Sequence, residues 1–324
     1  MAGAIKKTIF NVDPSLCSGC GTCAAACPLD ILEVQDSLCR MTKSFLCLEC
    51  NTCMRECPRH AISISSVTVE EAEADENASP GDGPAVFTHV LDRIMRAAEE
   101  AFRPHQVFSC GGIDVADLAS IDAGDVKGFT RCYQAPKLLK MYQQRLVFFD
   151  QMCVEVFGVV PDRNYDLPIF MFDWSESADS VFFVCDFYPT DDPGRNQPYL
   201  EKYLYAPLEE IYERHSSIPG LKTCPLHWVR AINSPYMLFG TVEKQPRENI
   251  GRLLNCAVDY LNAWIGLWKE AVPLDADSSY MKLVHERRNV LRRLYLENDP
   301  GIGSVNKFIG EEKGKRILEL IVPE

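Results

Sequence analysis

Apolar residues recur at helical spacing in three stretches of the chain after residue 84. The first stretch, residues 85–102, places on one side Phe87, Leu91, Ile94, Ala98 and Phe102. Because Pro104 cannot continue a helix, we expect this helix to end just before it. The second stretch, residues 247–268, repeats the pattern with Ile250, Leu254, Ala257, Leu261, Trp264 and Trp268. The third begins at Ser278 or Ser279, either of which suits a helix N-cap, and ends before Pro300.

Two apolar runs between these helices are rich in β-branched and aromatic residues, and they predict strands. They cover residues 167–175 and 180–189, and the second ends at Pro189. The residues "ESAD" between them are typical of a hairpin turn. Strands in the middle of the chain with helices on both sides predict an α+β domain, in which helices cover a mostly antiparallel sheet.

The first 67 residues follow a different pattern, with two closely spaced runs of cysteine. "CSGCGTCAAACP" covers residues 17–28, and "CLECNTCMRECP" covers residues 47–58. Each run has the spacing C-x2-C-x2-C-x3-C-P, which is typical of bacterial ferredoxins that bind [4Fe–4S] clusters. Structural zinc usually takes two cysteine pairs that are about a dozen or more residues apart, and a disulfide framework is the other alternative. The repeat predicts a small domain of βα units that binds two [4Fe–4S] clusters.

The ligands of each cluster follow from the way these runs cross over. In such domains the fourth cysteine of one run binds the cluster of the other run. The first cluster is therefore expected to use Cys17, Cys20, Cys23 and Cys57. The second is expected to use Cys47, Cys50, Cys53 and Cys27. Cys39 lies between the runs and is interpreted as a packing residue.

An acidic segment divides the chain. Residues 70–82 carry six acidic and no basic side chains, and residues 70–84 are rich in small residues, Gly and Pro. Such a segment cannot bury apolar surface, so we expect a ferredoxin domain at residues 1–67, a solvated linker at 68–84 and a second domain at 85–324. The formal net charge of −13 argues against nucleic acid as a partner.

Several familiar signals are missing from the sequence. No secretion signal and no run of eighteen apolar residues is found, so a cytoplasmic protein without a membrane partner is expected. No glycine fingerprint follows a strand, which argues against a flavin or nicotinamide cofactor. The six histidines form no HxH or HxxxH pair, so no metal site is expected in the second domain. We therefore expect the substrate itself to accept the electrons, while side chains supply the protons.

Three aspartates are candidates for proton transfer. Asp173 lies in the apolar run 167–175, where burial would raise its pKa and suit a proton donor. The alternation of a strand could equally turn Asp173 to solvent. Asp186, in the other predicted strand, has the same two interpretations. Asp299 ends a predicted helix and, taken alone, is typical of a capping acid.

The chain after residue 125 resembles the ferredoxin-dependent bilin reductases. The resemblance rests on Asp173, on Asn298-Asp299, and on the order and spacing of Arg131, Cys132, Tyr133, Gln134, Lys140, Met141, Leu167, Pro168, Asp186, Pro189, Trp228, Phe308, Gly310, Glu311, Val322 and Pro323. In this family an α/β/α sandwich with an antiparallel sheet holds a tetrapyrrole between the sheet and the C-terminal helices, without flavin or metal. Electrons arrive singly from ferredoxin, and acidic residues supply protons to bilin radicals.

The resemblance implies an oxidoreductase that acts on CH–CH groups of a linear tetrapyrrole of the biliverdin type. The chain's own ferredoxin domain would supply the electrons, and an upstream low-potential donor would reduce its clusters. Asp173 matches the central-strand aspartate that protonates the bilin, Asp299 matches the second aspartate, and Asn298 matches the residue before it. Lys222 matches, more loosely, an arginine that binds a propionate.

Four positions depart from the family member that reduces the D-ring vinyl group. Val156 and Tyr142 replace histidines, Gln144 replaces a glutamate, and Pro300 replaces a lysine that helps to hold a propionate. Reduction of the D-ring vinyl group is therefore not implied, and a chlorophyll-derived or other open-chain tetrapyrrole is an alternative substrate. A tetrapyrrole-binding electron carrier without catalytic activity is the alternative from another class. The presence of both Asp173 and Asp299 favours an enzyme.

Overall fold

The computed structural model describes residues 5–27, 29, 31–42, 47, 49, 51–69, 86–299 and 301–322. The chain folds into two compact units. Unit 1 comprises Met1–Pro84 and Asp299–Lys307, and unit 2 comprises Ala85–Asn298 and Phe308–Glu324. None of the helices in the described part of the chain is long and apolar enough to cross a membrane.

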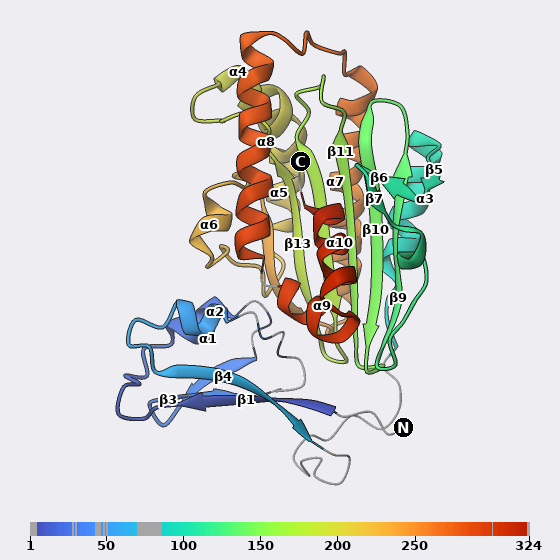
Figure 1. Cartoon of the computed structure of the whole chain (residues 1–324). Helices are drawn as coiled ribbons and strands as arrows, with labels where there is room; N and C mark the ends of the chain where they lie inside the picture. Colours follow the sequence, from blue (N-terminus) through green and yellow to red (C-terminus); the bar gives the residue numbers. More distant parts are fainter. Residues whose placement is uncertain are drawn as a thin grey trace. The chain divides into compact units, whose positions relative to one another are not determined.

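The N-terminal part of unit 1 is built from two short helices and two antiparallel strand pairs in its described residues (Figure 1). β1 (Ile5–Val12) pairs with β4 (Ile62–Val69), and β2 (Leu32–Gln35) pairs with β3 (Leu38–Met41). The helices are α1 (Thr22–Ala26) and α2 (Thr52–Arg55). Residues in the left-handed conformation precede both helices: Gly21 has a φ of 76° and Asn51 has a φ of 57°. Each turn therefore brings a cysteine run directly onto a helix, with Cys23 in α1 and Cys53 in α2.

The predicted linker, residues 68–84, lies largely outside the described residues. β4 continues to Val69, two residues beyond the predicted end of the ferredoxin domain at residue 67. The segment Asp299–Lys307, which includes most of α9 (Gly301–Ile309), is grouped with unit 1 although it lies near the C-terminus of the chain.

Unit 2 contains a large antiparallel sheet, as the sequence predicts. Its strand order is β14-β13-β12-β11-β10-β9-β5, with β8 also paired to β9. The strands are β5 (His105–Val107), β8 (Ile121–Asp122), β9 (Val126–Gln134), β10 (Leu138–Phe148), β11 (Met152–Pro161), β12 (Ile169–Glu176), β13 (Ser180–Tyr188) and β14 (Leu238–Glu243). A separate small pair joins β6 (Ser109–Cys110) to β7 (Ile113–Asp114). The two strands predicted at residues 167–175 and 180–189 are β12 and β13, and they form the predicted hairpin.

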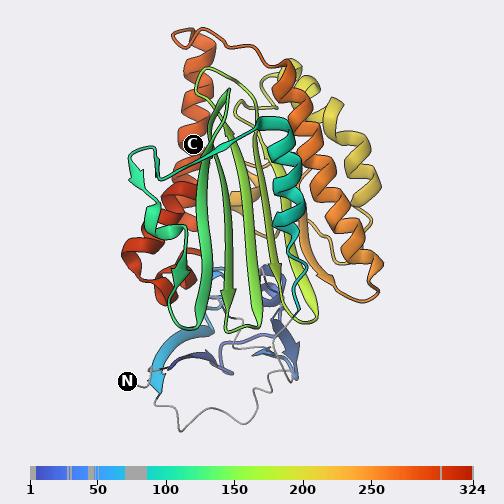
Figure 2. The same cartoon turned by 90° about the vertical axis from the view of Figure 1, so that its right-hand side faces the viewer.

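Helices cover both faces of this sheet, so unit 2 is an α/β/α sandwich (Figures 1 and 2). One face carries α3 (Val90–Phe102) and α7 (Glu248–Glu270), with α5 (Ala206–His215) beside α7. The other face carries α8 (Ser279–Asn298) and α10 (Glu311–Ile321). Shorter helical segments connect these elements: η3 (Ala116–Leu118), α4 (Gln197–Leu200), the π-helical η4 (Glu201–Tyr205) and α6 (His227–Arg230).

Strand alternation separates the two faces. In β12, Phe170, Phe172 and Trp174 join the apolar core under α3 and α7. Side chains at alternate positions point to opposite faces, so Met171 and Asp173 face the side of α8 and α10. The α3–α7 side is filled by large aromatic residues that are almost fully buried, whereas the α8–α10 side carries the aspartates Asp173 and Asp186.

Two of the predicted helices differ in detail from the structure. The first begins at Val90, so Phe87 is not part of it. The helix cannot start earlier because His89 has a φ of 51° and because Thr88 donates from its backbone N–H to Glu176, at 2.8 Å. In α7, Ile250, Leu254 and Trp268 are only partly buried, because the stripe that faces the core runs through Leu253, Cys256, Ala257, Tyr260, Leu261 and Trp264.

The third helix agrees closely with its prediction. α8 starts at Ser279, and the hydroxyl of Ser278 accepts a hydrogen bond from the backbone N–H of Met281 at 3.2 Å. Ser278 is therefore the N-cap.

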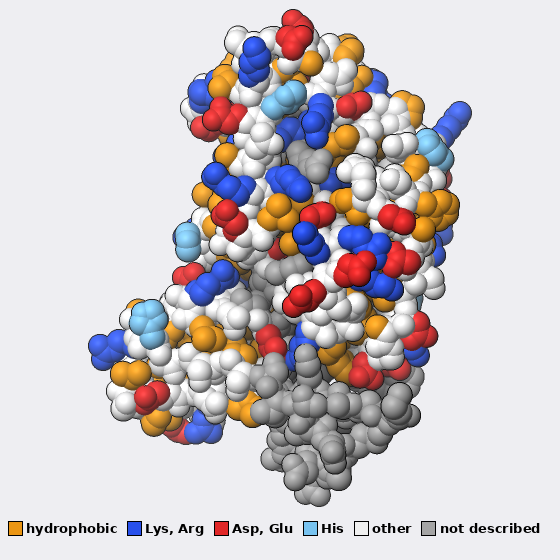
Figure 3. All heavy atoms as spheres, in the orientation of Figure 1, with side chains coloured by type: hydrophobic (Ala, Val, Ile, Leu, Met, Phe, Trp, Pro, Cys, Tyr) orange, Lys and Arg blue, Asp and Glu red, His pale blue; other side chains and the backbone are white. Residues whose placement is uncertain are grey.

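On the face shown in Figure 3, acidic and basic side chains alternate over the described part of α8 and α10. A bidentate ion pair connects α10 to η3. Arg316 donates from Nη1 and Nη2 to the two carboxylate oxygens of Asp117, at 2.8 and 2.9 Å. This pair holds α10 beside the edge of the sheet.

Candidate functional site

Asp173 lies in the middle of the sheet, on the face that α8 and α10 cover. Its neighbours in register are Val156 on β11 and Val184 on β13. The side chain is neither fully buried nor fully exposed, and its Oδ1 accepts a hydrogen bond from the hydroxyl of Ser175 at 3.1 Å. The sequence leaves open whether Asp173 is buried or turned to solvent. In the structure Asp173 lies on a face that helices cover, and its side chain remains partly accessible.

The residues level with Asp173 on the adjacent strands are not ionisable. Val156 pairs with Gln144 on β10, and Gln144 pairs with Thr130 on β9. The amide of Gln144 donates to the Thr130 hydroxyl at 2.9 Å, which satisfies both of these buried polar groups. On the far side, Val184 pairs with Phe239 on β14. Asp173 therefore supplies the one carboxyl in this row of paired residues.

The next row on the same face contains a tyrosine and a second aspartate. Tyr142 pairs with Gly158, and Met171 pairs with Asp186. The ring of Tyr142 lies directly over Gly158, because a Cβ added to that glycine would be 2.2 Å from Cζ of Tyr142. Glycine at position 158 therefore allows a fully buried tyrosine to lie across β11.

Asp186 is the buried carboxyl of this face. Its side chain is inaccessible to solvent, and it accepts hydrogen bonds from the backbone N–H of Ser234 at 2.9 Å and from the Ser234 hydroxyl at 2.5 Å. Burial raises the pKa of Asp186 to about 7, although both bonds from Ser234 act in the opposite direction. A signal for this position was available in the sequence: a hairpin that turns at residues 177–179 puts Asp186 on the same face as Asp173.

Asn298 and Asp299 lie at the end of α8. Asn298 is the last helical residue and donates from its side-chain amide to the carbonyl of Leu294 at 2.9 Å. Asp299 accepts a hydrogen bond from the backbone N–H of Gly301 at 2.7 Å, and burial raises the pKa of its carboxyl. Asp299 thus behaves locally as a capping acid for the start of α9, and it belongs to unit 1 whereas Asn298 belongs to unit 2.

Lys222 lies in a pocket of about 350 Å³ at the β14 edge of unit 2. The lining also includes Arg230 and Phe239, but not Asp173. Phe239 lies two strands away from Asp173 in the same row, across Val184. Two cations at one pocket suit an anionic group such as a carboxylate.

In unit 1 one cavity brings together four of the predicted ligands. Cys17, Cys20, Cys23 and Cys57 all line it, although Cys57 is 34 residues beyond Cys23 in the chain. Cys39 lines the same cavity and is almost fully buried, and burial together with a contact to Cys23 raises the pKa of its thiol. Four of these five thiols have the spacing of ferredoxin ligands, and four thiols are the donor set of a [4Fe–4S] cluster, so the residues fit the group.

The second predicted ligand set is only partly described. Cys27 and Cys53 are buried, and Cys47 is partly exposed. Cys50 lies outside the described residues, as does Pro28.

Comparisons with known proteins identify both parts of the chain. Residues 10–33 match the 4Fe-4S binding domain. Residues 116–322, more than half of the chain, match the model of the ferredoxin-dependent bilin reductases. The chain belongs to the ferredoxin-dependent bilin reductase family. It is thus an oxidoreductase that acts on a tetrapyrrole, and a 4Fe-4S binding region precedes its reductase domain in the chain.

A solved structure shares the fold of this bilin reductase. A phytochromobilin synthase from tomato, crystallised in complex with biliverdin, is 21% identical in sequence, with a TM-score of 0.58. The match covers 70% of this chain and 80% of the tomato chain. No curated protein matches the chain in sequence.

The departures of this bilin reductase from its vinyl-reducing relative gather on one face. Val156 and Gln144 occupy the row of Asp173, and Tyr142 occupies the row of Asp186. Pro300 lies outside the described residues. On this face the row of Asp173 therefore contains no histidine or glutamate, and the next row contains Tyr142 and Asp186.

Proposed function

We propose that the chain is a self-sufficient reductase of a linear tetrapyrrole of the biliverdin type. It takes electrons one at a time from two [4Fe–4S] clusters in its own N-terminal part and protons from Asp173 and Asp299. The observation that carries this proposal is the presence, in one chain, of a bilin reductase domain at residues 116–322 and a 4Fe-4S binding region at residues 10–33. Other members of the family, as its name states, depend on a ferredoxin.

The cavity lined by Cys17, Cys20, Cys23 and Cys57 supports the first cluster. A [4Fe–4S] cluster in such a site supplies single electrons at low potential. The second cluster is proposed from the repeated cysteine spacing, with Cys47, Cys50, Cys53 and Cys27 as ligands. A separate low-potential protein or reductant would reload both clusters, and neither flavin nor nicotinamide is needed for the electron path.

Protons are needed because each electron adds negative charge to a conjugated ligand in apolar surroundings. Uncompensated charge in such surroundings is costly, so electron transfer is coupled to proton transfer. The strand register supports Asp173 in this role, because its carboxyl is the one ionisable group in its row. The other residues of the row are Thr130, Gln144, Val156, Val184 and Phe239. Asp299 supplies a second proton. Burial raises the pKa of its carboxyl, which favours the protonated form.

The pocket at the β14 edge supports the choice of substrate. Lys222 and Arg230 provide positive charge at its lining, which suits the propionate groups of a bilin. Phe239 lines this pocket and Val184 lies between Phe239 and Asp173, and these apolar side chains suit the ring system. We propose that a CH–CH bond of the tetrapyrrole is reduced, at a position other than the D-ring vinyl group.

Replacement of Asp173 by asparagine tests the proton-transfer role, because it preserves the shape of the side chain and removes the acid. We expect Asp173→Asn to bind biliverdin but to stall, unreduced or as a long-lived radical, with the rate lower by on the order of 100-fold or more. Visible spectra and electron paramagnetic resonance, recorded anaerobically with a low-potential reductant, distinguish these states. Asp179→Asn, at an exposed position in the adjacent hairpin, is the matched control and should react at the wild-type rate.

Asp299→Asn should affect a different proton step, so we expect another intermediate to accumulate or another product to form. The iron–sulfur absorption should be unchanged in both variants. If both variants gave the wild-type product at the wild-type rate, neither acid would be catalytic. Binding of biliverdin without any spectral sign of reduction in the wild-type chain would instead favour a binding protein.

A further inference from the structure

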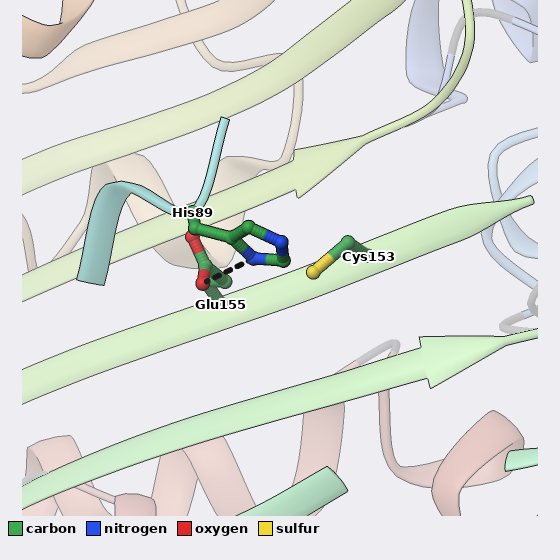
Figure 4. A group of neighbouring side chains, drawn as sticks. All are labelled: His89, Cys153 and Glu155. Carbon is green, nitrogen blue, oxygen red and sulfur yellow. Dashed lines mark ion pairs between the residues drawn. The ribbon is translucent and has the colours of Figure 1, made fainter. Parts of the chain in front are cut away.

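Three side chains with different ligand chemistry meet at the start of α3. They are His89, Cys153 and Glu155, and their ligand atoms all lie within 4.8 Å of one another (Figure 4). His89 precedes α3, whereas Cys153 and Glu155 lie on β11. Figure 4 shows that the imidazole and the thiol point toward each other above β11, with the carboxylate beside the ring. We propose that this group is a site for a zinc ion, with a water molecule as the fourth ligand.

The donor set is one that zinc accepts. Zinc binds imidazole nitrogen, thiolate sulfur and carboxylate oxygen, and it is commonly held by three protein ligands and one water. In a tetrahedral site the ligand atoms are roughly 3.5 Å apart, given bonds of about 2.0–2.3 Å. Nδ1 of His89 and Oε1 of Glu155 are already 3.9 Å apart. Because 45% of the His89 side chain is exposed, the ring is able to close the remaining distance and an ion has a route from solvent.

The charges around the group also favour a cation, although an arginine is present. Arg145 donates from Nε to Glu155 at 2.5 Å, and it also pairs with Asp92 at 2.7 Å. One guanidinium therefore faces two carboxylates, so the three groups together carry a net negative charge, which favours a cation. Burial raises the pKa of the Cys153 thiol, so zinc would displace its proton to solvent on binding. The resulting thiolate and the carboxylate together balance the two charges of the ion.

The backbone at the site is consistent with a functional role. His89 adopts a left-handed conformation with φ of 51° and ψ of 54°, which is uncommon for a residue with a side chain. This conformation turns the imidazole back toward β11 (Figure 4). The backbone N–H of Leu91, the second residue of α3, donates to the other carboxylate oxygen of Glu155 at 3.3 Å. A zinc ion here would join the start of α3 to the middle of the sheet.

The proposed site is separate from the candidate catalytic face. Cys153 and Glu155 alternate with Val154 and Val156, and Val156 is the partner of Asp173. The two sites therefore lie on opposite faces of β11. No local pattern indicates this group, because His89 and Cys153 are 64 residues apart and the histidines form no HxH or HxxxH pair.

The test uses the full chain, purified anaerobically with its iron–sulfur clusters intact. One equivalent of zinc sulfate is added, unbound metal is removed, and zinc and iron are both quantified. We expect one zinc per chain without loss of iron. X-ray absorption at the zinc edge should show one sulfur at about 2.3 Å and three nitrogen or oxygen atoms at about 2.0–2.2 Å.

His89→Ala and Cys153→Ser test the ligands, and His89→Ala is the more secure variant because the side chain is half-exposed. Each should weaken zinc binding by on the order of 100-fold or more, since even indirect partners of a metal contribute 10- to 100-fold. His105→Ala, at an exposed histidine of β5, is the matched control and should bind zinc like the wild type. Zinc should also raise the unfolding temperature of the wild type and of the control, but not of His89→Ala.

Three results would overturn the proposal. They are the absence of bound zinc, wild-type affinity in both ligand variants, and a zinc shell of sulfur atoms alone. The last result would mean that zinc had entered the cysteine sites of unit 1 instead.

Discussion

At the scale of single residues, Asp186 combines complete burial with a pKa near neutrality. The ordinary pKa of an aspartate is near 3.8, and in the folded chain that of Asp186 is about 7. The folded state therefore holds a proton that the unfolded state releases between about pH 4 and pH 7. Consequently the free energy of unfolding falls as the pH rises through this window, and the loss is complete above about pH 7.

Asp186→Asn should remove this dependence, because asparagine does not ionise. We expect the decline of unfolding free energy between pH 5 and pH 8 to become smaller by roughly 2–3 kcal/mol, at about 1.4 kcal/mol per pKa unit. Denaturant titrations followed by tryptophan fluorescence measure this, because the four tryptophans all lie within unit 2. Asp150→Asn, at an exposed position, is the control and should keep the wild-type slope. An unchanged slope in Asp186→Asn would mean that the folded chain ionises this carboxyl near the ordinary pKa of an aspartate, as the unfolded chain does.

Gly158 is glycine because the ring of Tyr142 lies directly over it. Alanine at this position would place Cβ 2.2 Å from the ring of Tyr142, so the ring or the strand must move. We expect Gly158→Ala to lower the free energy of unfolding by roughly 1–3 kcal/mol, as overpacking does in other cores. Slower reduction of the tetrapyrrole should accompany this loss, since Tyr142 lies one row from Asp173.

Gly266→Ala in α7 is the matched control for this substitution. No atom lies within 4 Å of the added Cβ, so alanine should stabilise the helix by roughly 0.5–1 kcal/mol. Denaturant titrations of the two variants should therefore shift in opposite directions. A neutral Gly158→Ala would show that Tyr142 has room to move.

At the scale of elements, two buried carboxylates hold the first turn of α3 on the sheet. Glu176 accepts hydrogen bonds from the backbone N–H and the hydroxyl of Thr88, at 2.8 and 2.9 Å. It also pairs with Lys244 at 2.8 Å and accepts from the indole of Trp174 at 3.0 Å. Glu155 accepts a hydrogen bond from the backbone N–H of Leu91. Negative groups at a helix N-terminus are favourable, and these contacts explain why α3 begins where it does.

Glu176→Gln should weaken the attachment of the first turn of α3 to the sheet. Glutamine still accepts hydrogen bonds, but it leaves Lys244 without its buried negative partner. We expect a loss of roughly 2–4 kcal/mol in unfolding free energy, near the range for breaking a buried ion pair. Hydrogen exchange should also become faster in the first turn of α3. Glu243→Gln, exposed at the end of β14, should change neither measurement; equal effects of the two variants would contradict this role of Glu176.

At the scale of the whole molecule, one chain carries both a 4Fe-4S binding region and a bilin reductase domain. Joining two parts in one chain raises the effective concentration of one at the other, to roughly the mM range. Chain purified anaerobically should contain about eight irons, since each of two clusters uses four. With a chemical reductant, this chain should reduce biliverdin without added ferredoxin.

Cys20→Ser provides the control for this prediction, because it alters one exposed ligand of the first proposed cluster and leaves unit 2 unchanged. Both the iron content and the unassisted rate should fall. A requirement for free ferredoxin, even when the chain's own clusters are reduced, would show that the fusion is not the route of the electrons. Zinc in place of iron would overturn the assignment of the N-terminal clusters.

Local patterns in the sequence determined much of this protein. The cysteine runs predict an iron–sulfur domain because their ligands are spaced within a few residues of each other, and the match at residues 10–33 supports that class of site. The hairpin of β12 and β13 and the N-cap at Ser278 were also predictable, because a turn or a cap depends on neighbouring residues. The spacing of weaker matches along residues 125–323 was sufficient to indicate the bilin reductase family.

Only the tertiary structure decided which side chains meet across strands. The buried stripe of α7 passes through Leu253 rather than Ile250 because the position of the sheet sets it, and the helical period alone does not. The meeting of His89 with Cys153 and Glu155 depends on where α3 docks, and the rows of Asp173 and Asp186 depend on strand register. Register and docking are set by packing between residues far apart in the chain, so no local pattern encodes them.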